Sequence, residues 1–356
     1  MHKIGREVLF LETNDTVSRM GEGAMIRTKD GAILFAYTKY ESNRHDHGTA
    51  QIAARCSYDE GEHWGEEFIL LTRENDDINI MSVSLMRMRN GDLGMFYLRK
   101  WDKDGLVLCT PMLRRSEDEG KRWSEAIRCS DIDDYIVVNN DRVIRTESGR
   151  LLIPAAIHSA AVATGKIGPG VGYCFYSDDD GYTWQDTGLR QEMPLVGGQV
   201  QEPGLYQHES GRLWMYYRTK MGYQYQCFSE DDGMTWSALS CNTFFSSPAS
   251  PMLIKRIHGK TLSVFNPIPA YTTREPSAPA GRSPYVLAVS DNDGVTHDGE
   301  SFSGLYYLED DLTNSYCYPT LLETKDGGCL ISYYHSNGTP HFLNCAKVVK
   351  IDMSKL

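Results

Sequence analysis

The most informative stretch of this 356-residue sequence is Ser57-Tyr58-Asp59-Glu60-Gly61-Glu62-His63-Trp64, because its pattern Ser-x-Asp-x-Gly-x-x-Trp recurs along the chain. Three further copies keep all four positions, and a fifth replaces Asp by Asn292 and Trp by His297. The five copies begin at Ser57, Ser116, Ser177, Ser229 and Ser290. Ser and Asp side chains bond nearby backbone N–H groups, Gly adopts a positive φ, and Trp covers the turn. We therefore expect hairpin turns built from structural rather than catalytic residues.

The spacing of these turns predicts the number of structural units. The copies begin about 58 residues apart on average, so the chain has room for about six units. A second series of Gly-containing polar turns alternates with the first, and each of its turns precedes a short apolar segment rich in β-forming residues. These turns lie at residues 29–31, 89–92, 147–150, 209–212 and 325–328. Because long helical periodicity is absent, we predict an all-β protein: a single six-bladed β-propeller over residues 1–356 with four-stranded antiparallel blades.

The composition excludes several classes of protein. The chain has 41% hydrophobic residues, and 36 Lys and Arg against 48 Asp and Glu give a net charge of −12. An acidic surface repels phosphate backbones, so we expect no nucleic-acid partner. The sequence has no long apolar run and no apolar N-terminal stretch, so we expect neither a membrane span nor an export signal. Nine scattered cysteines without a C-x-x-C pair predict free thiols and a cytoplasmic location.

A six-fold chain that carries these turns, known as Asp boxes, resembles the sialidase (neuraminidase) superfamily. The resemblance implies a propeller whose blade rims carry the boxes. It also implies a tyrosine nucleophile activated by a glutamate, an aspartate acid/base, and three arginines on the substrate carboxylate. It implies no cofactor.

The fourth, fifth and sixth units resemble the family most closely. Gln201-Glu202-Pro203 followed by Arg218 is similar to the family's order, which makes Glu202 the activator and Arg218 one arginine of the triad. Asn266-Pro267 followed by Arg282 resembles the family's next unit and makes Arg282 a second arginine. Tyr318-Pro319-Thr320-Leu321 then makes Tyr318 the candidate nucleophile. Tyr316 remains the alternative, because residues two apart share a strand face.

The first unit departs from the family pattern. Arg19 lies where the first triad arginine is expected, but Arg19-Met20-Gly21 replaces the family's Arg-Ile-Pro. Asp46 lies where the acid/base is expected, within His45-Asp46-His47. Either histidine could take over the acid/base role, and His47 is a candidate for substrate binding. We expect no metal here, since alternate residues on a short loop rarely supply a full ligand set.

Two further motifs have no counterpart in the family pattern. They are Asn139-Asn140-Asp141-Arg142 and Gln224-Tyr225-Gln226. We assign substrate contacts to Asn140, Asp141, Arg142 and Gln224, which could read a sugar other than N-acetylneuraminic acid, and also to Tyr316. A buried polar network is the alternative interpretation of the first motif.

These assignments suit one chemistry. Guanidinium groups bind a carboxylate bidentately and stay charged, and several of them together overcome the acidic surface. A neutral phenol can approach an anomeric carbon that bears a carboxylate, whereas Asp or Glu would be repelled. We predict an exo-acting, retaining glycoside hydrolase that releases terminal sialic acid or a related acidic ketose from a glycan or sialylated oligosaccharide. The alternatives are a glycosidase or lyase acting on a uronic-acid or arabinan oligomer, and a non-catalytic carbohydrate-binding propeller.

Overall fold

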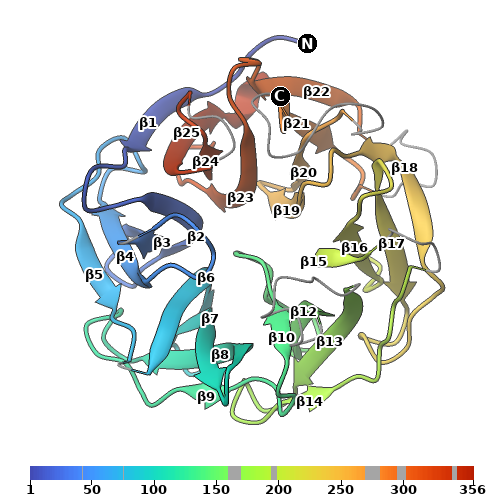
Figure 1. Cartoon of the computed structure of the whole chain (residues 1–356). Coiled ribbons are helices and arrows are strands. Elements are labelled where there is room, and N and C mark those ends of the chain that lie inside the picture. The colour runs from blue at the N-terminus through green and yellow to red at the C-terminus, as the bar shows by residue number, and fades with distance from the viewer. Residues whose placement is uncertain are drawn as a thin grey trace.

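The computed structural model describes residues 1–41, 43–74, 76–158, 170–193, 199–268, 281–294, 302–338 and 343–356. Its strands form six antiparallel blades arranged in a ring (Figure 1). Strands β2, β6, β10, β15, β19 and β23 lie nearest the centre of the ring. The predicted six-bladed, all-β architecture is confirmed.

The first three blades follow chain order. The first consists of β2 (Arg19–Arg27), β3 (Ile33–Tyr40), β4 (Ala50–Ser57) and β5 (Phe68–Leu71). The second consists of β6 (Asp77–Arg87), β7 (Leu93–Lys103), β8 (Leu106–Ser116) and β9 (Ile127–Arg128). The third consists of β10 (Tyr135–Val137), β11 (Ile144–Arg145), β12 (Leu151–His158), β13 (Val171–Ser177) and β14 (Gln185–Asp186). A parallel contact between β8 and β10 joins the second and third blades into one sheet.

The last three blades complete the ring. The fourth consists of β15 (Gln201–Gln207), β16 (Leu213–Arg218), β17 (Tyr223–Ser229) and β18 (Ser240–Ser246). The fifth consists of β19 (Leu253–Ile257), β20 (Lys260–Phe265), β21 (Tyr285–Ser290) and β22 (Gly304–Glu309). The sixth consists of β23 (Tyr316–Glu323), β24 (Gly328–His335), β25 (Cys345–Asp352) and, from the other end of the chain, β1 (Arg6–Leu11). A 3-10 turn, η2 (Met353–Lys355), follows β25.

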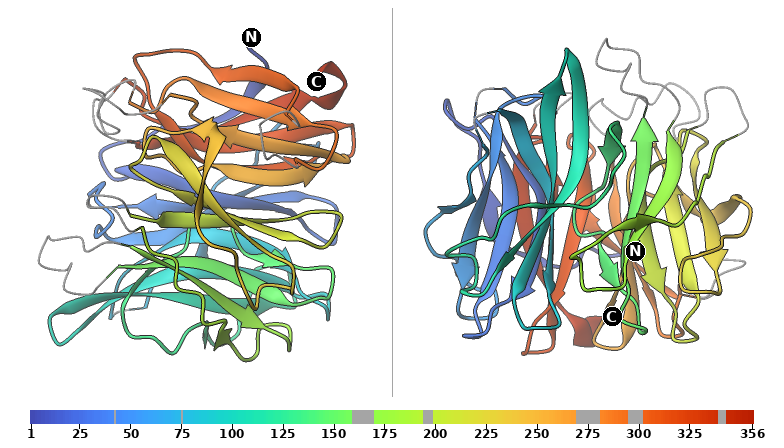
Figure 2. Two further views of the ribbon diagram at one scale, coloured as in Figure 1. Left: turned by 90° about the vertical axis from the view of Figure 1, so that its right-hand side faces the viewer. Right: turned by 90° about the horizontal axis from the view of Figure 1, so that it is seen from below.

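The blades stand side by side around the ring (Figure 2). Apolar side chains pack between neighbouring blades. Leu34 and Ile52 of the first blade, for example, pack with Val83 and Met95 of the second. Within the described ranges, no helix is long and apolar enough to cross a membrane.

The Asp-box turns have the predicted hydrogen bonds. In the first box the Gly61 amide donates to Ser57 Oγ over 2.9 Å, and Ser57 Oγ and the His63 amide each donate to Asp59 Oδ1 over 2.9 Å. The fifth box keeps the Ser290–Gly294 bond, and its His297 lies outside the described residues. The tryptophan of the second box also reaches the neighbouring blade, since Trp123 Nε1 donates to the Leu70 carbonyl over 2.9 Å.

The residue that precedes each box glycine forms a clamp between blades, which the sequence reasoning missed. Glu60 has a φ of +58°, and its carboxylate accepts hydrogen bonds from Nη1 and Nη2 of Arg27 at 2.9 and 2.6 Å. It also accepts the backbone N–H of Lys325, in the sixth blade, at 2.8 Å. Glu119 repeats the arrangement with Arg87 and the Lys29 N–H. Asp180 repeats it with Arg145 and the Arg89 N–H.

The innermost strands bulge at equivalent places. The strand pairing shifts register at the bulges of β2, β6, β15 and β23. The bulged residues Glu22, Ser82, Glu202 and Tyr318 have positive φ angles of 51°, 57°, 41° and 59°. A bulge bends its strand and redirects a side chain. Here each bulge turns one polar side chain toward the same cavity.

A short segment after β10 reaches toward the middle of the ring (green in Figure 1) and bonds to other blades. Asn140 Nδ2 donates to the Gly23 carbonyl over 2.8 Å and to the Pro319 carbonyl over 3.3 Å. The Asp141 N–H donates to the Val83 carbonyl over 2.9 Å, and Arg142 Nη2 donates to the Met252 carbonyl over 2.7 Å. Residues 138–142, which we call the central segment, therefore bond to four other blades.

Candidate active site

A polar cavity of about 500 Å³ lies among the innermost strands. Its polar lining comes from the first, second, third, fourth and sixth blades and from the loop before β21. These residues are Glu22, Asp46, His47, Ser82, Lys100, Tyr135, Asn139, His158, Gln201, Glu202, Arg218, Arg282 and Tyr318. Tyr318, Glu202, Asp46, Arg218, Arg282 and His47, which the sequence analysis singled out, thus come together around one cavity.

The centre of the cavity wall is a chain of three groups. Tyr318 Oη donates to Glu202 Oε1 over 2.6 Å, and Arg218 Nη1 donates to Glu202 Oε2 over 2.6 Å. Burial alone would raise the pKa of Glu202, but the charge of Arg218 and the hydrogen bonds from Tyr318 and Arg218 lower it below its usual value. Burial, and next the charge of Glu202, raise the pKa of Tyr318 well above its usual value. The result is a neutral phenol hydrogen-bonded to a carboxylate that can take its proton.

Arg282 lies beside this chain. Its guanidinium carbon is 5.8 Å from the centre of the Tyr318 ring, and its Nη1 donates to Cys317 Sγ over 2.9 Å. Asn266 fixes the local backbone by donating to the Arg282 carbonyl over 2.7 Å. The Nε atoms of Arg218 and Arg282 are buried, and neither has a hydrogen-bond partner among the described residues. Unpaired donors on two adjacent cations suit an anionic ligand.

Arg19 is engaged on three sides. Its Nε donates to Tyr334 Oη over 2.8 Å, its Nη1 to Asp46 Oδ1 over 2.6 Å and its Nη2 to Glu22 Oε1 over 2.5 Å. Asp46 lies at the mouth of the cavity with 59% of its side chain exposed. Desolvation would raise the pKa of Asp46, but the charges of Arg19 and Lys100 hold it well below its usual range. Burial outweighs the charge of Arg19 at Glu22, so the pKa of Glu22 is raised.

Arg19 does not line the cavity, and five further assigned side chains also lie apart from its lining. Asn140, Asp141 and Arg142 belong to the central segment, where Asn140 and Arg142 bond to backbone carbonyls and Asp141 pairs with Lys255 at 2.9 Å. These bonds favour the alternative interpretation of the motif, a buried polar network, over substrate contacts.

The other two are Gln224 and Tyr316. Gln224 is buried and donates to Ser247 Oγ and the Ser250 carbonyl. Tyr316 packs in the apolar core between the fifth and sixth blades and donates to the Asp311 carbonyl. Tyr316 precedes the bulge of β23 and Tyr318 occupies it, so the expectation that both share one strand face fails.

Sequence reasoning also missed Glu22, Ser82 and Lys100. None of them lies in a motif, and they reach the cavity from separate strands. The available signal for Glu22 was its position between Gly21 and Gly23, because glycine within a strand marks a bulge or a close backbone approach. A Cβ on Gly21 would lie 2.2 Å from Tyr334 Cε1, so the close approach exists.

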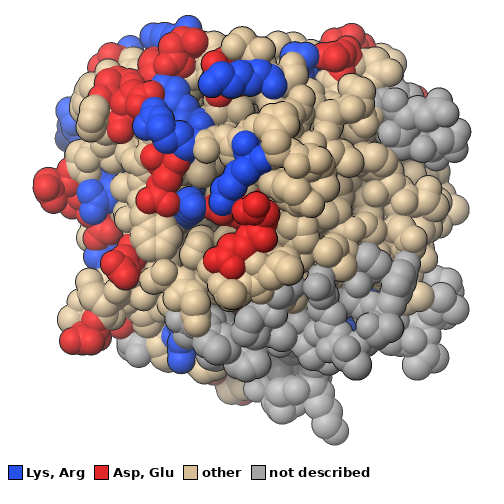
Figure 3. Space-filling model, turned by 90° about the horizontal axis from the view of Figure 1, so that it is seen from above, with Lys and Arg blue, Asp and Glu red and all other residues tan. Residues whose placement is uncertain are grey.

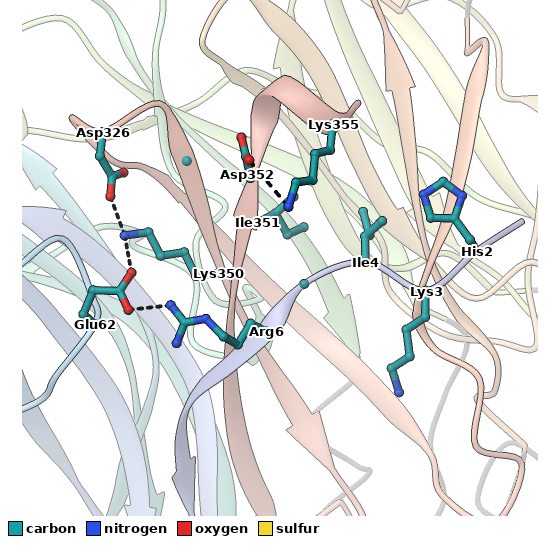
Figure 4. A pocket seen from close by; sticks show the side chains of 12 residues that line it. His2, Lys3, Ile4, Arg6, Glu62, Asp326, Lys350, Ile351, Asp352 and Lys355 are labelled. Atoms are coloured by element: carbon teal, nitrogen blue, oxygen red, sulfur yellow. Dashed lines mark hydrogen bonds and ion pairs between the residues drawn. The ribbon is translucent and has the colours of Figure 1, made fainter.

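A second hollow of about 500 Å³ lies where β1 meets β25 (Figure 4). Its charged groups neutralise one another: Lys350 bonds Glu62 at 2.9 Å and Asp326 at 2.6 Å, and Arg6 also pairs with Glu62. The molecular face seen from above likewise has basic and acidic side chains interspersed (Figure 3). Among the described residues, no group of three or more His, Cys, Asp or Glu side chains could hold a metal ion.

The ring of blades, the box turns and the cavity among the inner strands together define a sialidase-type propeller. Residues 16–331 match the model of the BNR repeat-like domain family, and the chain belongs to that family. No curated protein sequence matches the chain significantly.

Several solved sialidase structures share the fold. The leech intramolecular trans-sialidase, solved with 2,7-anhydro-Neu5Ac, is 15% identical with a TM-score of 0.73, covering 100% of this chain and 71% of that chain. The Ruminococcus gnavus intramolecular trans-sialidase, solved with oseltamivir carboxylate, is 14% identical with a TM-score of 0.73, and the match covers 98% of both chains. The NanB sialidase of Streptococcus pneumoniae is 12% identical with a TM-score of 0.71, covering 98% of this chain and 71% of that chain.

Proposed function

We propose that this protein is an exo-acting, retaining glycoside hydrolase that releases terminal sialic acid or a related acidic ketose from glycans or oligosaccharides. The observation that carries the proposal is the 2.6 Å hydrogen bond from Tyr318 Oη to Glu202, with Arg218 and Arg282 beside it. A tyrosine bonded to a buried carboxylate is an activated nucleophile, and two adjacent cations supply a site for the substrate carboxylate.

The proposed reaction has two steps. Tyr318 Oη forms a bond to the anomeric carbon while the glycosidic C–O bond breaks and the phenol proton passes to Glu202. Asp46, at the cavity mouth, donates a proton to the leaving oxygen. Water then attacks the anomeric carbon and gives its proton to Asp46, while Glu202 returns its proton to the departing Tyr318 oxygen. The configuration at the anomeric carbon is retained.

Asp46 must hold a proton for the first step. In the free protein its ion pair with Arg19 opposes protonation. A substrate carboxylate held by Arg218 and Arg282 would bring a negative charge into the cavity that Asp46 lines, and a nearby negative charge raises the pKa of a carboxyl group. Binding of an acidic sugar thereby prepares the proton donor.

One observation favours a second candidate, a glycosidase or lyase that acts on a uronic-acid oligomer. Arg19 already bonds Glu22, Asp46 and Tyr334, whereas Arg218 and Arg282 keep unpaired Nε donors within the described structure. A site with two available arginines suits a carboxylate that needs fewer contacts than a sialic acid bound by three.

Hydrolysis of 4-methylumbelliferyl N-acetylneuraminate by the wild-type, Tyr318→Phe and Tyr316→Phe proteins tests the proposal. We expect the wild type to turn over, Tyr318→Phe to lose at least about 10³-fold in kcat, and Tyr316→Phe to stay within a few-fold. Turnover of 4-methylumbelliferyl glucuronide by a wild type that is inert toward sialosides would favour the second candidate. Binding of acidic sugars without any turnover would identify a non-catalytic lectin-like propeller.

The proposal includes a cytoplasmic location. All nine cysteines are free, and most of them are buried, which supports a reducing compartment. The substrate would then be an imported oligosaccharide rather than a surface glycoprotein.

A further inference from the structure

The cavity wall formed by the first three blades has a different chemistry from the wall that holds Tyr318. It carries a carboxylate, an ammonium and an amide within one lining: Glu22 on β2, Lys100 on β7 and Asn139 at the start of the central segment. The exposed fractions of these residues are 4%, 3% and 2%. Such groups are buried at a cost in free energy unless they are bonded, so their partners must be accounted for.

Glu22 is held rigidly and keeps capacity for further bonds. One carboxylate oxygen accepts Arg19 Nη2 over 2.5 Å, and the other accepts Ser82 Oγ over 2.5 Å. A carboxylate has about four acceptor positions, and these two bonds use two of them. The bulge at Glu22 turns the remaining acceptor positions toward the cavity that Glu22 lines.

Lys100 and Asn139 supply the complementary donors. Lys100 Nζ donates to the Asp46 carbonyl over 2.7 Å and lies 5.4 Å from the centre of the Tyr135 ring. An ammonium has three N–H donors, and the Asp46 carbonyl and the Tyr135 hydroxyl engage two of them, so Lys100 has one donor left for a ligand. Asn139 Oδ1 accepts the Asn140 N–H over 2.8 Å, whereas Asn139 Nδ2 is buried with no partner in the described ranges. An unsatisfied buried amide that lines a cavity points to a ligand.

We propose that Glu22, Lys100 and Asn139 form a sugar-reading wall that binds the hydroxyl and amide substituents of the substrate ring. The inference rests on the proposed function, in which Arg218 and Arg282 hold the substrate carboxylate. A hydroxyl group donates one hydrogen bond and accepts others, so it can donate to Glu22 and accept from Lys100 or Asn139. A second carboxylate on the sugar would face Glu22 and be repelled. The preferred substrate unit therefore carries one carboxylate and neutral polar substituents on the opposite side of the ring.

Calorimetric binding of a panel of acidic sugars tests the wall separately from turnover. The panel contains N-acetylneuraminic acid, 3-deoxy-D-manno-octulosonic acid, and the methyl glycosides of glucuronic and galacturonic acid. The proteins are the wild type, Glu22→Gln, Lys100→Met and Arg218→Met. Lys103→Met is the matched control, because Lys103 lies on the same strand as Lys100 but at the exposed hairpin end.

We expect the best-bound sugar to lose about 10- to 100-fold in affinity in Glu22→Gln and Lys100→Met and to keep it in Lys103→Met. The fold-loss in affinity that each substitution causes should differ among the panel sugars, because each sugar presents different substituents to the wall. Unchanged affinities, or one equal factor for every sugar, would overturn the inference. If Glu22→Gln or Lys100→Met does not fold, Glu22→Asp and Lys100→Arg are measured in its place. Each of these should keep part of the wild-type affinity.

Failure of the proposed function gives a different result. If no sugar of the panel binds the wild type, both the acidic-sugar proposal and the wall are overturned. If Arg218→Met abolishes binding while Glu22→Gln and Lys100→Met bind as the wild type does, the acidic-sugar proposal stands and the wall is wrong.

Discussion

Glu202 lies between a guanidinium and a phenol, and these two neighbours decide what its carboxylate can do. Arg218 keeps it ionised, and Tyr318 supplies the proton that it would accept. The proposed reaction needs the ionised form, so we expect activity to fall as the pH drops through the pKa of Glu202. Because that pKa is lowered, the fall should lie below the usual glutamate value of about 4.5.

Replacing Arg218 by Met should therefore shift the acid limb of the pH profile. Burial would then act on Glu202 without its nearest cation, and the pKa of Glu202 should rise. We expect the acid limb of kcat/KM, measured with a sensitive fluorogenic substrate, to move to higher pH in the slower variant. Arg150→Met, at a rim ion pair with Asp178, should leave the limb in place. A limb that stays at the wild-type pH in Arg218→Met would contradict this account of Glu202.

At the scale of elements, the innermost strands assemble the site through their bulges. The sequence pattern was sufficient to predict short β-strands and the turns between them, because both follow local rules. It was not sufficient to predict which face each side chain takes beyond a bulge, since one extra residue reverses the alternation. Tyr316 and Tyr318 illustrate the difference: the first packs in the core and the second faces Glu202.

The central segment provides a second example and a prediction about stability. Asn140→Ala removes a buried amide that bonds the Gly23 and Pro319 carbonyls on two other blades. Leaving those carbonyls without that partner should lower the free energy of unfolding by about 1 to 3 kcal/mol, measured by urea denaturation. Substrate affinity should change little, because Asn140 lies apart from the cavity lining. If the Asn140→Ala variant kept its stability but had a higher KM, Asn140 would be a substrate contact after all.

At the scale of the whole molecule, ring closure brings the site together. Tyr318 and Glu202 are 116 positions apart in the sequence, and they meet because their strands are inner strands of the same ring. The repeat predicted that ring, and the resemblance then placed Tyr318, Glu202, Arg218 and Arg282 in it. Ser82 and Lys100 could not be predicted, because no local pattern marks them and their place in the cavity depends on which strands become neighbours in the ring.

The ring closes where the two ends of the chain meet. Strand β1 pairs with β25, and residues just before β1 bond to β22 of the fifth blade, where the Ile4 N–H donates to the Tyr307 carbonyl over 2.9 Å. Glu309 lies at this junction. It accepts Lys3 over 2.9 Å, Lys347 over 2.6 Å and Tyr333 Oη over 2.7 Å. A single carboxylate thus links the N-terminal segment, β22, β24 and β25.

This junction should make the stability of the ring depend on pH. Burial would raise the pKa of Glu309, but bonds from Lys347, Tyr333 and Lys3 lower it. A carboxyl group with a lowered folded-state pKa stabilises the fold above its unfolded pKa, and that contribution is lost as the pH falls through the folded value.

Glu309→Gln should therefore be less stable than the wild type by about 2 to 3 kcal/mol at pH 7, measured by urea denaturation. The difference should be smaller at about pH 3 than at pH 7, because the carboxyl group begins to lose its charge as the pH falls below its unfolded pKa. Glu7→Gln, which removes a half-exposed partner of Lys347, should change stability by less than about 1 kcal/mol. If the wild type and Glu309→Gln differ by the same free energy of unfolding at both pH values, the charge of Glu309 does not stabilise this junction.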